Sequence, residues 1–237
     1  MTEPTAIERA DELYGRVRRC TLCVLSRTRQ NAVPGEGPLD AEIMFIGEAP
    51  GANEDKQGRP FVGQAGQFLS ELLGAAGLRR EEVYICNVLK CRPPGNRDPL
   101  PDEIASCKGY LDEQIELIDP PVIVTLGRYS MARWFPQQTI SRVHGRFRIL
   151  EGRYYVPMYH PAAALHQQNL RDVLLEDFRA LPAIVQAARA ARIVAAAPDV
   201  SMHEQPAGCL EAPGAVPTID ESEPSTTAPA KQARLFE

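Results

Sequence analysis

Residues 43–51 read Ile-Met-Phe-Ile-Gly-Glu-Ala-Pro-Gly, a short apolar run that ends in a turn containing glycine and proline. The pattern of apolar run, turn and helix-like segment recurs, and the apolar runs are Ile43–Ile46, Val83–Val88, Val122–Leu126 and Tyr155–Tyr159. The helix-like segments are about Ala65–Ala76, Asp102–Ile118, Arg128–Phe135 and Asn169–Ala191. Strands that alternate with helices indicate a mainly parallel sheet covered by helices. The sequence therefore predicts an α/β fold whose sheet has about four strands.

The segments outside this repeating pattern also carry structural signals. Residues 1–19 have apolar side chains near helical spacing and predict a helix. Residues 145–158 could hold a hairpin, in which Phe147–Leu150 turns at Glu151–Gly152 into Tyr154–Met158. After residue 198 the composition changes to Pro, Ala, Ser, Thr and acidic residues. Such a segment buries too little apolar surface to offset its ordering entropy. We therefore expect one folded domain over 1–198 and a disordered acidic tail over 199–237.

The charge distribution separates the same two parts. The tail holds seven acidic and two basic residues, which accounts for the whole net charge of −5 and leaves residues 1–198 neutral. A neutral domain can bind nucleic acid if its basic side chains gather on one face. No apolar run approaches the roughly 20 residues that span a bilayer, and the first ten residues contain no apolar core of a secretory signal. We expect a cytoplasmic protein with no membrane contact.

Four of the six cysteines form two groups. Cys20 and Cys23 make a Cys-x-x-Cys pair, whereas Cys91 and Cys107 are separated by 15 residues. In a cytosolic chain such groups favour a metal site over disulfides. Four thiolates suit zinc and an iron–sulfur cluster equally well, so the spacing leaves both open. Cys86 lies inside a predicted strand, where a small buried thiol is expected.

Polar and aromatic residues fall where the predicted strands end. Glu48 and then Glu54 and Phe61 follow the first strand, Asn87 ends the second, and His160 follows the last. The carboxyl ends of parallel strands meet at one edge of a sheet, and ligands of open α/β sheets bind there. The sequence therefore predicts that these side chains converge on one site.

These residues together resemble a known family. The Cys20-x-x-Cys23 pair, GEAPG at 47–51, Glu54-Asp55, FVG at 61–63, Asn87 with KCRP at 90–93, Cys107 and HPAAA at 160–164 are similar to the family 4 uracil-DNA glycosylases. The resemblance implies a three-layer α/β/α fold and a 4Fe-4S cluster on Cys20, Cys23, Cys91 and Cys107. It also implies base excision repair: hydrolysis of the N-glycosidic bond of uracil in DNA.

Two neighbouring families differ from this chain at identifiable positions. Family 5 relatives have an apolar first motif that lacks the acid, whereas Glu48 is present here. The uracil-crosslinking relatives carry an inserted basic loop with a reactive histidine, and no such segment occurs between Gly77 and Asn87 or after Pro94. The resemblance therefore implies an enzyme that releases its product.

The resemblance assigns base-binding roles to three side chains. Phe61 would stack on the flipped base, and the Asn87 amide would pair with uracil O4 and N3–H because it both donates and accepts. Cytosine presents the opposite pattern and would be rejected. His160, as a neutral imidazole, would donate a hydrogen bond to uracil O2 while negative charge builds on the departing base.

The remaining catalytic roles concern the sugar, the water and the base edge. An oxocarbenium-like sugar needs nearby negative charge and a positioned water, for which we favour Glu48 and place Glu54 second. The backbone amides of Gly47, Glu48 and Ala49 would hold the edge of the base.

Contacts with DNA and with a partner protein are expected from other positions. Phosphate contacts are predicted for Lys90, Arg92, Arg142 and Arg146, and Leu165 is predicted to enter the vacated base stack. The last residues, with Gln232, Leu235 and Phe236, resemble the peptide by which bacterial repair proteins bind the sliding clamp. We expect a monomer. The alternatives are a non-catalytic, zinc-containing DNA-binding protein and a glycosylase with a broader range of deaminated bases.

Overall fold

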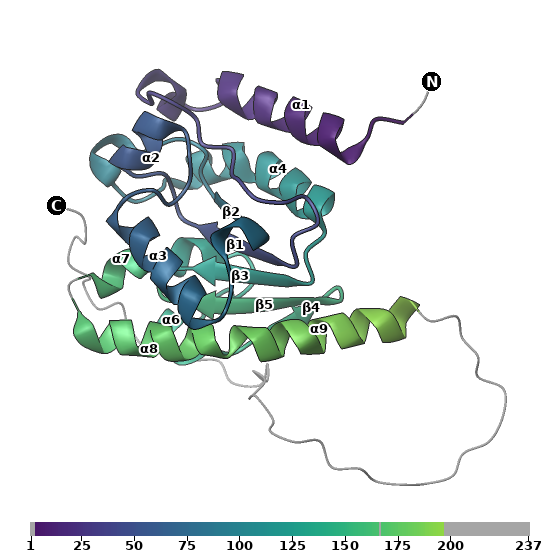
Figure 1. The fold of residues 1–237 in the computed structure, drawn as a ribbon. Helices are drawn as coiled ribbons and strands as arrows, with labels where there is room; N and C mark the ends of the chain where they lie inside the picture. Colours follow the sequence, from purple (N-terminus) through teal and green to yellow (C-terminus); the bar gives the residue numbers. More distant parts are fainter. Residues whose placement is uncertain (1–2, 166, 197–237) are drawn as a thin grey trace, which may run out of the picture.

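The computed structural model describes residues 3–165 and 167–196, which form a three-layer α/β/α domain (Figure 1). Its central sheet has five strands in the order β2-β1-β3-β5-β4. The strands are β1 (Ile43–Gly47), β2 (Tyr84–Asn87), β3 (Val122–Leu126), β4 (Arg148–Leu150) and β5 (Arg153–Met158). All neighbouring strands run parallel except β4, which pairs antiparallel with β5. The carboxyl ends of β1, β2, β3 and β5 therefore meet at one edge.

Helices cover both faces of this sheet. The α-helices are α1 (Ala6–Arg19), α2 (Ala52–Gln57), α3 (Gln64–Ala75), α4 (Pro101–Ile118), α5 (Arg128–Met131), α6 (Ile140–Val143), α7 (Pro161–Ala164), α8 (Gln168–Arg179) and α9 (Leu181–Ala196). Short 3-10 helices lie at Val24–Arg27, Arg80–Glu82 and Pro94–Asn96. Helices α3, α8 and α9 cover one face, and α4 covers the other (Figure 1). Met131 of α5 and Val143 of α6 belong to the same buried cluster as α4.

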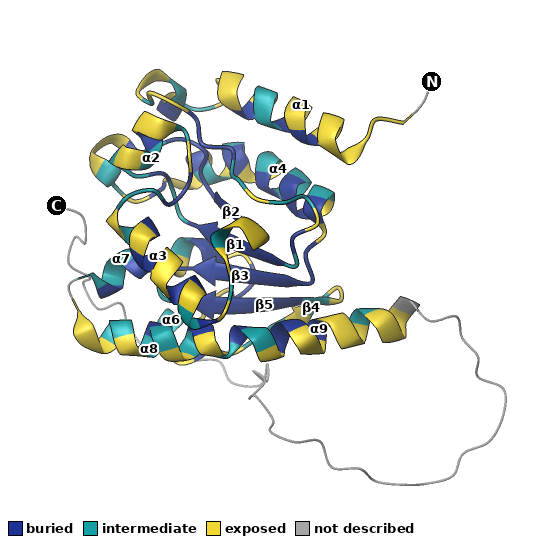
Figure 2. Ribbon diagram, in the orientation of Figure 1, coloured by how far each residue is buried: buried dark blue, intermediate teal, exposed yellow. Residues whose placement is uncertain are grey.

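Strands β1, β2, β3 and β5 are buried on both faces, which explains why they read as continuous apolar runs, whereas β4 is partly exposed (Figure 2). Phe45 of β1 packs with α3, α8 and α9, and its ring stacks on that of Phe178 with centroids 5.7 Å apart. Its neighbours Met44 and Ile46 point to the opposite face and pack with α4 and α5. The apolar pattern therefore fixes two cores, one on each side of the sheet.

A third, smaller core joins the N-terminal helix to the domain. Leu13 and Val17 of α1 pack with Leu25, Cys91 and Cys107, the last of which lies on α4. A capping box between Thr5 and Glu8 fixes where α1 begins. This core surrounds the cysteines that the sequence singled out.

The predicted α/β class is confirmed, and several details differ from the sequence expectation. The hairpin exists and adds β4 as a fifth strand. The predicted helix at 128–135 ends at Met131, and the chain continues in turns as far as Gln137. The predicted helix at 169–191 is two helices that break at Ala180, since Pro182 has no N–H for a continuous helix. Helix α2 was not predicted.

The tail predicted at 199–237 lies outside the described residues, as does the possible clamp-binding peptide. None of the helices within 3–165 and 167–196 is long and apolar enough to cross a lipid bilayer.

Candidate active site

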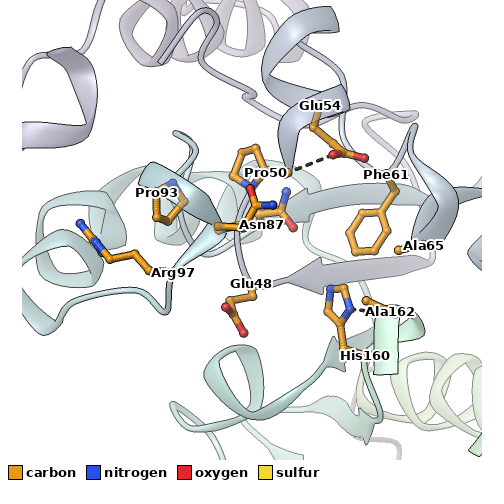
Figure 3. Close-up of a pocket in the computed structure, with 13 residues that line it drawn as sticks. Glu48, Pro50, Glu54, Phe61, Ala65, Asn87, Pro93, Arg97, His160 and Ala162 are labelled. Atoms are coloured by element: carbon orange, nitrogen blue, oxygen red, sulfur yellow. Dashed lines mark hydrogen bonds between the residues drawn. The ribbon is translucent and has the colours of Figure 1, made fainter. Parts of the chain in front are cut away.

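A pocket of about 110 Å³ opens at the carboxyl edge of the sheet (Figure 3). Six of the residues singled out from the sequence line it: Glu48, Ala49, Glu54, Phe61, Asn87 and His160. They come from the carboxyl end of β2 and from the segments that follow β1 and β5, as the parallel topology requires. The pocket is much smaller than the ~300 Å³ at which sites for drug-sized ligands begin, so it suits a single small ring.

Asn87 contributes a buried amide to this pocket. It is the last residue of β2 and is 1% exposed. Neither Nδ2 nor Oδ1 has a hydrogen-bond partner among the residues that the structure describes. An unpaired buried amide is unfavourable by about 1–3 kcal/mol, so this arrangement favours a ligand with complementary groups.

Gly47 allows Asn87 and Phe61 to lie close to the end of β1. A Cβ atom at position 47 would stand 2.3 Å from Asn87 Oδ1 and 2.7 Å from the Phe61 ring. Both distances are well inside van der Waals contact, so only glycine fits here without a shift of the two side chains. Gly47, whose amide was predicted to hold the base edge, therefore also leaves room for the side chains of Asn87 and Phe61 in the pocket.

Phe61 has a strained backbone that its neighbours hold in place. Its φ of 50° lies in the left-handed region, which bulky side chains rarely adopt and which is unfavourable by about 1–3 kcal/mol. Arg80 donates to the carbonyl oxygens of Pro60 (2.6 Å) and Phe61 (3.2 Å). At Gly66 a Cβ would stand 1.9 Å from the Phe61 carbonyl oxygen. The ring is thereby fixed beside His160, with centroids 5.7 Å apart.

The carboxylate of Glu54 binds the backbone of the loop that carries Phe61. Its carboxylate accepts from the backbone N–H groups of Gly51 (3.1 Å), Val62 (2.9 Å) and Gly63 (2.8 Å). Three such bonds occupy most of its acceptor capacity and tie the turn after β1 to the Phe61 loop. Among the two carboxylates considered for the water, the structure therefore favours Glu48. The adjacent Asp55 is a buried turn cap that accepts from the N–H groups of Gln30 and Asn31.

His160 is neutral, and one of its nitrogens remains available as a donor. It caps α7, and its Nδ1 accepts a hydrogen bond from the Ala162 N–H at 3.1 Å. Burial lowers the pKa of His160 to about 4, although the negative charge of Glu54 opposes this shift. Because Nδ1 is the acceptor, the proton of the neutral ring resides on Nε2. The predicted neutral N–H donor is thus consistent with the local geometry.

Glu48 follows the last residue of β1 and is half-buried. Burial raises the pKa of Glu48 to about 7; the charge of Asp98 adds to the shift, and Arg128 opposes it. The carboxylate therefore changes charge near neutral pH. Perturbed acids in a pocket are candidates for catalysis.

The prediction that Lys90 contacts DNA is wrong. The side chain is 1% exposed, and Nζ donates to the Asn87 carbonyl oxygen and to Gln114 Oε1, at 2.6 Å each. The amine is buried because both of its acceptors are buried. The prediction of a DNA contact had assumed an exposed side chain, since lysine is usually found at the surface.

The other predicted DNA contacts remain available at the surface. Arg92 bonds to Asn96 Oδ1 at 2.7 Å, and Leu165 packs against the core at the end of α7. Arg142 and Arg146 are exposed, and neither forms an ion pair with another described residue. Pocket residues that sequence reasoning did not assign to the base site are Pro50, Gly51, Ala65, Pro93, Asn96, Arg97 and Ala162. Those at 93–97 lie at the end of the KCRP motif or just after it, and the position of that motif beside Asn87 was the available signal.

The four predicted cysteine ligands lie near one another. Cys91 and Cys107 are each 3% exposed, and Cys20 and Cys23 are half-buried. The charges of Cys20 and Cys23 act on Cys91, and those of Cys91 and Cys23 act on Cys107, so the thiols share one neighbourhood. Arg29 Nη1 donates to Cys91 Sγ at 2.9 Å, and the Leu22 N–H donates to Cys20 Sγ at 3.5 Å. Donors aimed at sulfur suit thiolates that bind a metal centre.

Within the described part of the chain, no three His, Cys, Asp or Glu side chains form a group that could hold a single metal ion. Cys91 and Cys107 are buried in the small apolar core beside α1, and Cys23 packs against it.

Residues 34–180 match the family model of the uracil DNA glycosylase superfamily. The chain belongs to this superfamily. A type-4 uracil-DNA glycosylase of Saccharolobus solfataricus is 50% identical over 183 residues, which cover 73% of this chain and 85% of that protein. The type-4 uracil-DNA glycosylase of Thermotoga maritima is 49% identical over 167 residues, which cover 68% of this chain and 87% of that protein.

The type-5 enzymes are more distant. A type-5 uracil-DNA glycosylase of Thermus thermophilus is 31% identical over 174 residues, which cover 62% of this chain and 79% of that protein. The similarity therefore places this uracil-DNA glycosylase superfamily member among the type-4 proteins, as the first motif with Glu48 predicted.

Proposed function

We propose that this chain removes uracil from DNA by hydrolysing its N-glycosidic bond and leaves an abasic site. The observation that carries the proposal is the buried Asn87 amide, whose donor and acceptor both face a pocket beside the Phe61 ring and the His160 ring. The type-4 relatives, which are uracil-DNA glycosylases by name, support the same reaction.

Recognition of the base depends on Asn87 and Phe61. A base in a duplex is out of reach, so the nucleotide is flipped into the pocket. There the Asn87 Nδ2 donates to uracil O4, and its Oδ1 accepts from N3–H. Cytosine would set a donor against Nδ2 and an acceptor against Oδ1, which leaves buried polar groups unpaired. The ring of Phe61 supplies the flat apolar wall on which the base stacks.

His160 stabilises the departing base. As the N-glycosidic bond breaks, negative charge builds on uracil O2, and the Nε2–H of the neutral imidazole donates to that oxygen. A donor positioned before the reaction needs no reorganisation when the charge appears. The low pKa of His160, about 4, means that this role persists across the neutral pH range.

Glu48 acts on the opposite side of the reaction. Its carboxylate stabilises the cationic sugar and orients the water that attacks it, and the amides of the Gly47–Ala49 turn hold the base edge. Glu54 positions Phe61 through its three backbone bonds. Since burial raises the pKa of Glu48 to about 7, the active ionised form dominates only above neutral pH.

We further propose that Cys20, Cys23, Cys91 and Cys107 hold a 4Fe-4S cluster. Bound there, the cluster would cross-link the N-terminal segment after α1 to α4 and to the loop after Asn87. Burial raises the pKa of Cys107 to about 11, so a metal centre must displace its proton. The purified protein is expected to be brown and to contain about four irons per chain. A colourless protein that contains zinc would overturn this assignment.

We also propose surface contacts with DNA and with a partner protein. Phosphates on either side of the flipped nucleotide would be bound by Arg92, Arg142 and Arg146, and Leu165 would fill the place of the flipped base in the stack. Gln232, Leu235 and Phe236 would bind a sliding clamp through two apolar anchors. A peptide of the last ten or so residues should bind the clamp, and the paired changes Leu235→Ala and Phe236→Ala should abolish binding.

The reaction is tested on a labelled oligonucleotide with a single uracil, followed by alkali to cleave abasic sites. Cleavage should depend on uracil and should fall at least about 100-fold in His160→Ala, the size of effect seen when an oxyanion donor is removed. His144→Ala is the matched control, because His144 bonds to Asp177 and does not line the pocket. A cluster-containing protein that leaves uracil in place would refute the proposed function. A hypoxanthine oligonucleotide tests the broader base range.

A further inference from the structure

Residues 87–91 connect the pocket to the cysteine site within five positions. Asn87 ends β2, and Cys91 is one of the four proposed cluster ligands. The intervening residues are fixed to the turn after β1, because Val88 N–H donates to the Gly47 carbonyl oxygen and Leu89 N–H donates to that of Glu48, at 3.0 Å each. Lys90 is the remaining member of the segment, and neither site as described uses its side chain.

Lys90 is buried between the two sites. Its Nζ donates to the Asn87 carbonyl oxygen at 2.6 Å, and the next residue in the chain is the proposed cluster ligand Cys91. Its own carbonyl oxygen accepts from the Val33 N–H at 2.7 Å. One residue therefore holds the peptide that carries the base-reading amide and is joined directly to a proposed cluster ligand.

The second acceptor of the amine belongs to a fixed network. Gln114 on α4 accepts from Lys90 through Oε1 at 2.6 Å. The Nε2 of Gln114 donates to the Pro34 carbonyl oxygen at 2.7 Å and to the Tyr84 hydroxyl at 2.9 Å, which leaves Oε1 as the acceptor. The Tyr84 hydroxyl in turn shares a 2.8 Å hydrogen bond with that of Tyr14 on α1. The amine is thus held in one orientation.

Burial of this amine is expensive. An amine taken out of water loses hydration, and Lys90 forms no ion pair with a carboxylate among the described residues. A side chain that only filled space could be an unbranched apolar one such as methionine. An amine at this position can donate a hydrogen bond to the Asn87 carbonyl oxygen, which an apolar side chain cannot do.

We propose that Lys90 is a positioning residue that holds the Asn87 amide in the orientation that pairs with uracil. It does so from a chain segment that is anchored at the cysteine site. The proposal rests on the proposed function of Asn87. Loss of the Nζ bond removes one of the two hydrogen bonds that hold the Asn87–Val88 peptide group, and the Asn87 side chain then misaligns against the base. A misplacement of about 1 Å at a reacting group can lower the rate by about 100-fold.

The test compares base-dependent and base-independent binding in Lys90→Met, which keeps an unbranched side chain, one atom shorter, and removes its donors. Full-length, iron-containing protein is assayed for single-turnover uracil excision, inhibition by free uracil and affinity for abasic-site DNA. We expect excision and uracil affinity to fall roughly 10- to 100-fold. Affinity for abasic-site DNA and iron content should stay at the wild-type level, because no base is present to misalign and the four cysteines are unchanged.

A double-mutant cycle separates positioning from a general loss of structure. If Lys90 acts through Asn87, Lys90→Met should add little to Asn87→Ala, since the amide it positions is already gone. Tyr14→Phe removes only the far hydroxyl of the network and should keep full uracil affinity. If Lys90→Met does not fold, Gln114→Met removes the second acceptor of the amine and should give a smaller change of the same kind.

The positioning role would be overturned if the losses of excision in Lys90→Met and Asn87→Ala were additive in the double variant. It would also be overturned if affinity for abasic-site DNA or iron content fell in parallel with excision. A wild-type protein that is inactive on uracil and does not bind free uracil would instead refute the proposed function itself.

Discussion

Replacing Glu48 by glutamine should make the protein more stable and less active. The carboxylate of Glu48 is half-buried, and burial raises its pKa from the ordinary value of 4.5 to about 7. The folded state therefore binds this proton more tightly than the unfolded chain does. The resulting stabilisation is complete below pH 4.5 and is lost as the pH rises through about 7. Above that pH the folded protein carries an unfavourable buried charge.

The size of the effect follows from the pKa. A change from 4.5 to about 7 corresponds to about 3 kcal/mol at roughly 1.4 kcal/mol per pKa unit. Glutamine has the same shape and no charge at any pH. The free energy of unfolding of Glu48→Gln relative to wild type should therefore increase by about 2 kcal/mol between about pH 5.5 and about pH 8.5.

Urea denaturation at the two pH values measures this difference. Glu81→Gln, which replaces a carboxylate that is 66% exposed, is the matched control and should show the same difference from wild type at both. Wild-type excision should rise with pH through about 7 as Glu48 ionises, and the Glu48→Gln variant should lose that rise together with most of its rate. A stability difference that does not change with pH, or a variant less stable than wild type at the higher pH, would refute the reasoning.

Three further substitutions test the pocket. Asn87→Asp removes the donor for uracil O4 and should lower kcat/KM on uracil DNA at least about 100-fold, so an unchanged rate in a folded variant would contradict the assigned pairing. Gly47→Ala places a methyl group 2.3 Å from Asn87 Oδ1 and should lower excision with little loss of iron, measured side by side on the same preparation. Glu54→Gln turns an amide NH₂ toward backbone N–H groups and should lower the free energy of unfolding by about 1–3 kcal/mol in urea; a variant as stable as wild type would argue against the loop-anchoring role.

The sequence predicted the arrangement of the site because one rule governs it. Apolar runs of strand length marked β1, β2, β3 and β5, and parallel strands bring their carboxyl ends together. Once that edge was identified, Asn87 and His160 were expected at the same edge although 73 positions separate them. The same argument does not extend to short elements. The three residues of β4 are too few for a reliable alternating pattern, and α2 begins at a glycine within the motif itself.

The roles of individual polar side chains were harder to predict, because they depend on partners from other elements. Lys90 is buried by acceptors at Asn87 and at Gln114, which lies 24 positions away on a helix. Glu48 and Glu54 are similar in sequence context, yet Glu54 meets three backbone N–H groups whereas Glu48 lies beside Asp98 and Arg128. The backbone strain at Phe61 has no sequence signal, since φ above zero is expected at glycine.

The outer strands of the sheet bear on the behaviour of the protein at high concentration. Unpaired strand edges are templates for self-association. On the β2 side, Glu36 exchanges two backbone hydrogen bonds with Ile85, at 2.9 and 2.8 Å, and so occupies the groups that a neighbouring copy would use. On the other side, β4 has three residues, begins with the charged Arg148 and runs straight into a turn. Neither margin offers a long flat run of free amides within the described residues, so the purified enzyme should resist self-association through the edges of its sheet.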